Sequence, residues 1–313
     1  MTKLFASALI ALTATMLAAP VAARAAATGG DKEVNRSTGF GGACPKCELS
    51  GRRLSGAHFM GANFSGATLV GSDLREAQFL GSNFTGADLS RADLTDAQIL
   101  GTIFTNAIMQ HTRMRSTEAK GGQFSGANMT EVDLSDASAV GAMFIKTILT
   151  RAVFRSTEMQ GANLTHADAR GAVFHDASME GAVLVNGRFD RANFHSADLN
   201  MAVLTGSSFD EADFKDAGLH HAVIEGVDLS RAHGLTQDQV DEACGDAKTR
   251  LPRGLTAKPC SGISVRAIIR QGASKWMHIS GPPAPPAPPA PPAPPAPPSP
   301  PYGGHYLVDP ERY

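Results

Sequence analysis

The chain has 313 residues, with 28 lysines and arginines against 30 aspartates and glutamates, so its formal net charge is −2. This charge is too small for a strong steering field and has the wrong sign for nucleic acid, so no nucleic-acid partner is expected. Beyond the N-terminus, no run approaches the ~20 apolar residues that a membrane-spanning helix needs, and we expect no transmembrane segment in the mature chain.

Residues 1–25 have the layout of a secretory signal peptide. Lys3 gives a positive start, residues 4–19 are apolar, and Ala-Arg-Ala at 23–25 offers a cleavage site. Removal of Lys3 and Arg24 would take the formal charge from −2 to −4. The sequence therefore predicts a periplasmic or secreted protein; a cytoplasmic protein with a weak N-terminal anchor is the alternative.

Residues 26–48 are expected to be a flexible lead-in that ends in an N-terminal cap. A Cys-Pro-Lys-Cys stretch stands there, from Cys44 to Cys47. Cysteines at this spacing also occur in thioredoxin-like redox pairs, but those lie near a βαβ pattern that is lacking here. We favour a disulfide that staples the end of the fold.

Residues 49–234 repeat with a period of five. Stepping by five from Phe59 to Leu229 gives 35 positions: thirteen Phe, twelve Leu, five Met, two Ile and three Ala. Stepping from Ala57 to Ala232 gives 36 small or short residues, of which 24 are Ala. A helix has a period of 3.6 and a strand a period of 2, so a fixed period of five indicates a solenoid.

A longer period of twenty lies within the shorter one. One inward column contains only phenylalanine over five turns: Phe64, Phe84, Phe104, Phe124 and Phe144. This order is expected if four five-residue sides make one coil and side chains twenty residues apart stack. The pattern predicts a four-sided β-helix of about nine coils, spaced ~4.8 Å and roughly 40–45 Å long.

The repeated unit reads A-(N/D)-(L/F)-x-x, as in Ala62-Asn63-Phe64-Ser65-Gly66. Maintained from residue 58 to residue 232, this unit resembles the pentapeptide-repeat family. The resemblance implies an all-β fold, a right-handed quadrilateral β-helix. The handedness is implied by the resemblance and not by the spacing.

Two expectations concern local geometry. Two sides of the square carry Gly or Asn at the turn, in the columns of Gly61 and Gly66, which suits the positive φ of type II turns. The other two sides carry charged or hydroxyl residues there, so we expect their turns to differ. We also expect a local irregularity near Ala119 and Ala139, which are successive small residues in one inward column.

Residues 235–260 are predicted to cap the far end of the β-helix. Thr236 and Gln239 have capping-box spacing, and the expected helix runs to Arg250, before Pro252. Four residues share one face of that helix: Val240, Ala243, Cys244 and Ala247. The region also resembles the closing segment of many bacterial pentapeptide-repeat proteins.

The four cysteines allow three pairings. Because the ends of so long a β-helix lie much farther apart than the ~7 Å Cα limit of a disulfide, only pairing within each end is possible. We therefore predict Cys44–Cys47 and Cys244–Cys260, formed in an oxidising compartment. The same separation excludes a four-cysteine zinc site within one molecule.

Residues 261–281 are predicted to be a linker, in which residues 263–269 have the composition of a short strand. Residues 282–313 are a proline-rich tail, with 14 prolines between Pro282 and Pro301. That stretch should adopt polyproline II and extend about 60 Å. It is either a spacer that tethers the protein or, as we favour, a solvating tail.

The outward positions carry no recognised catalytic, phosphate-binding or dinucleotide-binding motif, so we predict no enzyme and no cofactor. Positive and negative columns alternate and are expected to form solvated ion pairs. His175 and His195 lie one coil apart, and with Asp176 they could share a metal ion. We favour a chance stack of two exposed histidines and predict no metal site.

Two outward columns are unusually apolar and form our candidate interaction surface, for an unknown protein partner or a homodimer. The seven candidate residues are Met60, Leu80, Leu100, Val140, Val183, Val203 and Val223.

The sequence favours a non-catalytic structural or protein-interaction scaffold. Some members of the family that it resembles mimic duplex DNA and protect DNA gyrase. That function requires a dominant acidic face and a cytoplasmic location, whereas this chain has interleaved charges and a predicted signal peptide. An enzyme is the third possibility, and a hydrolase screen would test it.

Overall fold

The computed structural model describes residues 42–260, all within the chain's second unit, Glu33–Tyr313. The predicted signal peptide, most of the lead-in, the linker and the proline-rich tail lie outside the described residues. None of the helices within 42–260 is long and apolar enough to cross a membrane.

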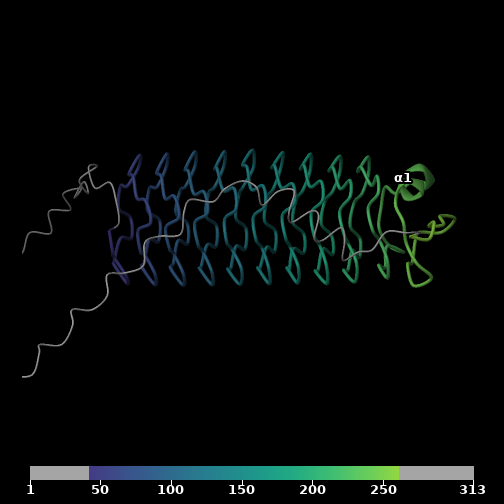
Figure 1. Ribbon diagram of the computed structural model, residues 1–313, viewed down its shortest axis with the longest axis horizontal. Coiled ribbons are helices and arrows are strands. Elements are labelled where there is room, and N and C mark those ends of the chain that lie inside the picture. Colours follow the sequence, from purple (N-terminus) through teal and green to yellow (C-terminus); the bar gives the residue numbers. More distant parts are fainter. Residues whose placement is uncertain (1–41, 261–313) are drawn as a thin grey trace, which may run out of the picture. The chain divides into compact units, whose positions relative to one another are not determined.

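Residues twenty apart are paired along the stack of coils (Figure 1). Parallel bridges join each outward residue to its equivalent in the next coil, from Ala43 with Asn63 to Asp213 with His233. Each contact is a single-residue bridge, so the described residues contain no extended strand. The bridges begin at Ala43, six residues before the expected start at residue 49.

The inward columns form one continuous core. The rings of Phe64 and Phe84 stack with centroids 4.8 Å apart, and those of Phe104 and Phe124 are 5.2 Å apart. A second stack, built from Phe154 and its successors, continues at 4.9–5.1 Å. These rings are buried, so each adds both apolar area and aromatic contact to the stability of the stack.

The Asn or Asp of the repeat unit holds the corner that follows it. Asp88 Oδ1 accepts hydrogen bonds from the backbone N–H and the hydroxyl of Ser90, at 2.9 and 2.6 Å. Asn63 accepts from the N–H of Ser65 in the same way, at 3.0 Å. The short side chain thus satisfies a backbone donor where the chain leaves the ladder, which explains the preference for these two residue types.

The four sides do not differ at their turns, which corrects the sequence expectation. Every fifth residue from 46 to 226 has positive φ, including Arg91 at 58°, Glu131 at 57° and Met201 at 57°. In Arg91, Glu131 and Met201 the backbone N–H donates to a carbonyl of the next coil, as Arg91 does to Gln110 at 2.9 Å. Stacking therefore imposes the left-handed conformation on side chains that ordinarily disfavour it by about 1–2 kcal/mol.

The expected irregularity near Ala119 and Ala139 is also absent. Their backbone N–H groups donate to the next coil at 2.7 Å, the same geometry as in neighbouring coils. The other inward positions nearby include the fully buried Met109, Met114 and Met129. These flexible side chains can fill the space that the alanines leave in the core, so the coil keeps its regular geometry.

The single helix of the described residues, α1, spans Gln237–Glu242 (Figure 1). Its capping box is present, with Thr236 N–H donating to Gln239 Oε1 at 2.8 Å. The Gln239 amide in turn donates to the carbonyls of Phe214 and Ala217, at 2.9 Å each. These bonds tie the start of the helix to the coil that precedes it.

The helix ends eight residues before the expected Arg250, because the chain returns to the ladder. Ala243 is already extended, and Cys244 N–H donates to the Ala222 carbonyl at 2.9 Å. Cys244 then bridges Val223, so it continues an outward column of the β-helix and does not lie on a helix face.

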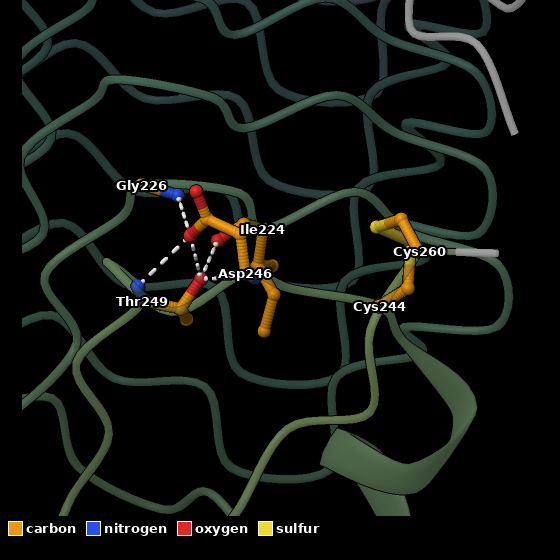
Figure 2. The surroundings of a disulfide bond; sticks show 6 residues. All are labelled: Ile224, Gly226, Cys244, Asp246, Thr249 and Cys260. Atoms are coloured by element: carbon orange, nitrogen blue, oxygen red, sulfur yellow. Dashed lines mark hydrogen bonds between the residues drawn. A yellow bond between two sulfur atoms is a disulfide. The ribbon is translucent and has the colours of Figure 1, made fainter.

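A compact hydrogen-bond cluster fixes the chain after Cys244 (Figure 2). Asp246 Oδ1 accepts from the backbone N–H groups of Gly226 and Thr249, at 2.8 and 3.0 Å. The Thr249 hydroxyl donates to the Ile224 carbonyl at 2.8 Å. The bond from Gly226, followed by those from Thr249 and Lys248, holds the pKa of Asp246 below its usual range despite some desolvation.

Candidate interaction surface

One of the four sides presents no charged residue at its outward positions; we call this column the uncharged face. Consecutive members bridge one another along the stack. The uncharged face consists of Asn63, Asn83, Ile103, Gln123, Met143, Asn163, Val183, Val203 and Val223. Amide and aliphatic side chains at every bridging position give a column that can be covered without desolvating a charge of its own.

The opposite side has a different chemistry, with ion pairs along and between coils. Asp73 pairs with Arg75 at 2.7 Å, and Asp93 with Arg113 at 3.7 Å. The hydrogen bond from Arg75 is the main reason that the pKa of Asp73 lies below its usual range. These arginines are more than half exposed, so each pair adds little to stability, and the side stays charged and hydrated.

The corners between sides also carry positively and negatively charged side chains in successive coils. Arg151 pairs with Glu131 one coil below, and Arg231 pairs with Glu211 one coil below. Asp168 is partly buried, and this burial is the largest single influence on its pKa, which it acts to raise. Arg170 and Arg188 outweigh that influence, so the pKa of Asp168 is lowered.

The N-terminal half of the uncharged face is open. Met60 at its corner is 43% exposed and Met143 is 37% exposed. On the adjoining side, Ile108 and Ile148 are each 41% exposed, and sequence reasoning missed these two. Leu80, Leu100 and Val140 of the predicted surface are half-buried along the same corner.

The C-terminal half of the uncharged face is not an exposed stripe, which corrects the prediction for three valines. Val183 is only 8% exposed, and Val203 and Val223 are fully buried. The last two form a small cluster, outside the main core, with Cys244, Val185 and Cys260. Their outward direction, which the repeat predicted, therefore does not make them accessible.

Both predicted disulfides are present in the structure. Cys44 and Cys47 lie at inward positions of the first coil, with Cα atoms 5.4 Å apart, and pack against the end of the core. Cys244 and Cys260 have Cα atoms 4.8 Å apart (Figure 2). No cysteine among the described residues is free.

The stacked histidines have local partners. The rings of His175 and His195 lie 5.0 Å apart at centroids. The Nδ1 of His175 lies 2.9 Å from the His195 carbonyl oxygen, which can only accept, so this nitrogen carries the proton. Within residues 42–260, no group of three His, Cys, Asp or Glu side chains is placed to hold a metal ion.

Two family models, both described as pentapeptide repeats, match the chain. One matches overlapping segments that span residues 46–118 and 120–195, and the other matches residues 189–233. The chain belongs to the pentapeptide-repeat family. No curated protein sequence matches this pentapeptide-repeat protein.

Several solved structures are similar to it. HetL, a pentapeptide repeat protein involved in heterocyst differentiation regulation from the cyanobacterium Nostoc sp. strain PCC 7120, is 24% identical with a TM-score of 0.57; the match covers 69% of this chain and 92% of HetL. Full-length QnrB1, a plasmid-mediated fluoroquinolone resistance protein, is 18% identical with a TM-score of 0.30, over 66% and 94% of the two chains. A pentapeptide repeat protein from the Arabidopsis thaliana thylakoid lumen is 23% identical with a TM-score of 0.29, over 50% and 90%.

At this level of identity, the likeness to HetL shows a shared fold and says nothing about function. It agrees with the β-helix that the repeat unit implied.

Proposed function

We propose that this pentapeptide-repeat protein is a non-catalytic scaffold that binds another protein through the N-terminal half of the uncharged face. The proposal includes export through residues 1–25 and a periplasmic or secreted location. It also includes the finer description of the fold as a right-handed quadrilateral β-helix of about nine coils, closed by the segment that contains α1.

The observation that carries the proposal is the exposure of large apolar side chains on and beside a column whose bridging residues carry no charge. Met60, Ile108, Met143 and Ile148 are the most exposed large hydrophobic residues described, and all lie on the uncharged face, its corner or the adjoining side. A protein partner that covers them gains apolar burial, and the bridging column that contains Met143 adds no charge to the contact. Polar Gln123 and Asn163 in the same column can contribute hydrogen bonds at little desolvation cost.

A non-catalytic role is supported by how the reactive residue types are used. His175 lies against a carbonyl and a carboxylate group, and the four cysteines are paired in disulfides. The carboxylates that show shifted pKa values are shifted downward, which suits ion pairs and hydrogen bonds and not general acid catalysis.

The test is affinity capture from envelope extracts with the full mature chain as bait, and with a variant lacking residues 282–313. We expect the wild type to retain one partner. The amount captured should fall at least about tenfold with Met143→Asp, because this variant places an unpaired charge in the contact. Val153→Asp is the matched control, because Val153 is a half-buried outward residue on the opposite side. Equal capture by the two variants would contradict the proposal.

A second copy of this chain is the alternative occupant of the same surface. Light scattering separates the two cases, since a homodimer would be present in purified protein and would dissociate on Met143→Asp. The gyrase-protecting function gains no support from the described surface, because stacked pairs such as Arg151 with Glu131 leave no dominant acidic face.

A further inference from the structure

The two ends of the β-helix differ in how the backbone ladder stops. At the C-terminal end, where α1 lies (Figure 1), Cys244 N–H donates to the Ala222 carbonyl at 2.9 Å, and the Cys244 carbonyl accepts from Ile224 N–H at 2.8 Å. Arg250 closes the neighbouring side in the same way, because its N–H donates to the Val227 carbonyl at 2.9 Å. Residues outside the repeat therefore take up ladder positions at this end.

At the N-terminal end, the first coil leaves ladder positions without a partner among the described residues. In the second coil, Thr68 N–H donates to the Cys47 carbonyl at 2.8 Å, and the Thr68 carbonyl accepts from Leu49 N–H at 2.7 Å. Glu48, the equivalent of Thr68 in the first coil, makes neither bond within residues 42–260, and the same holds for His58. The N–H and C=O groups of these two residues point away from the second coil, so they form an edge to which another chain can pair.

The apolar core is also only partly covered at the N-terminal end. Phe59 stacks on Phe79 with ring centroids 5.3 Å apart, but Phe79 is fully buried and Phe59 is half-buried. Leu49 and the Cys44–Cys47 disulfide are half-buried at inward positions of the same coil. A partner that covers this end therefore buries apolar side chains together with the backbone edge.

A second copy of the chain has the geometry to meet this end head to head. Two identical coils that face each other across a two-fold axis run in opposite directions, so their ladder residues pair as in an antiparallel sheet. In such a sheet, a residue with both its N–H and its C=O at the edge exchanges two hydrogen bonds with the residue opposite. A coil with four sides allows four such axes, two through the middles of opposite sides and two through opposite corners.

The charges of the first coil favour one of these four axes. Its ladder residues are, in chain order, Ala43, Glu48, Arg53 and His58, and the last three are exposed. The axis through the corner between Glu48 and Arg53 places each of these two residues opposite the other in the second copy, and Ala43 opposite His58. An axis through the middle of a side sets Glu48 against Glu48 or Arg53 against Arg53, and the other corner axis sets Arg53 against His58. Opposite charges stabilise a cross-strand pair and like charges destabilise it, so the first arrangement is preferred.

We propose that two copies of this chain associate head to head through the N-terminal end of the β-helix, with Glu48 of each copy opposite Arg53 of the other. The backbone groups of Glu48 and His58 gain partners, and Leu49 and Phe59 become covered. The C-terminal end does not take part, because residues outside the repeat already close its ladder. The inference does not depend on the proposed function, since the uncharged face runs along the stack and not across its end.

Charge reversal tests the proposal, with sedimentation equilibrium of the full mature chain as the measurement. The wild type should dimerise. Glu48→Arg and Arg53→Glu should each raise the dimer dissociation constant about tenfold or more, because each variant places like charges opposite one another at two symmetry-related positions. An equimolar mixture of the two variants should recover the wild-type affinity, because both cross-strand pairs of the heterodimer then join opposite charges.

Glu118→Arg is the matched control, because Glu118 is an exposed ladder residue of a middle coil, and this variant should dimerise like the wild type. A monomeric wild type, or two single variants that do not associate when mixed, would show that the proposal is wrong. A dimer that Met143→Asp dissociates and Glu48→Arg does not would form through the uncharged face and also overturn it. Dimerisation that appears only after removal of residues 26–41 would mean that this segment covers the end, which overturns the proposal as well.

Discussion

The two halves of the uncharged face share one backbone geometry and differ in what covers them. At Met143 and at Val203 the chain makes the same bridges to the coils above and below. Met143 is 37% exposed, whereas Val203 is fully buried in a cluster that includes Cys244 and Cys260. The comparison teaches that the repeat sets the direction of a side chain, while its environment depends on segments outside the repeat.

The largest effect should come from the core that supports both halves. Phe104→Ala removes a ring stacked on Phe84 and Phe124 and should destabilise the protein by about 3–5 kcal/mol. Denaturant unfolding measures this loss. An effect no larger than that of an outward substitution such as Ile108→Ala would mean that the stacked rings contribute little.

Removing each disulfide in turn should destabilise the protein by a different amount at each end of the β-helix. Replacing Cys244 and Cys260 by Ala opens a loop of 16 residues, for which chain entropy predicts a loss of about 3 kcal/mol. The corresponding change at Cys44 and Cys47 opens a separation of only 3 residues and should cost less. Thermal unfolding of both variants tests the order, and the reverse order would contradict it.

A milder pair of substitutions compares the two halves of the uncharged face directly. Val203→Ala deletes two buried methyl groups and should destabilise the protein by about 1.5 kcal/mol. Met143→Ala removes a larger but partly exposed side chain and should cost less than half as much. Similar losses in urea unfolding would indicate that the burial difference between the two halves does not persist in solution.

The smallest effect concerns pH and the C-terminal end alone. Because the pKa of Asp246 is lowered from 3.8 in the folded protein, its contribution to stability is full above that value and is lost as the pH falls through the lower folded value. Melting temperatures between pH 5 and pH 2 should therefore drop slightly more for the wild type than for Asp246→Asn. An identical drop would mean that the bonds from Gly226 and Thr249 do not favour the charged carboxylate.

Much of the fold is written in the sequence because each repeat specifies its own side of the square. The spacing of Phe64 and Phe84 predicted their stacking, and the positions of Cys44 and Cys244 at opposite ends predicted the disulfide partners. These inferences depend on periodicity, which one-dimensional information carries well. The same periodicity identified the outward columns from which the candidate surface was chosen.

Tertiary structure decided what depends on contact between segments. Arg91 and Glu131 adopt positive φ because their N–H groups donate to carbonyls of the next coil. The conformational preference of an arginine or a glutamate does not predict this backbone conformation. The helix α1 ends at Glu242 because Cys244 pairs with the ladder, although its helical spacing continues. Val203 and Val223 are buried because other groups lie over them. A five-residue pattern predicts which way a side chain points, but it does not predict which residues of other segments cover that side chain.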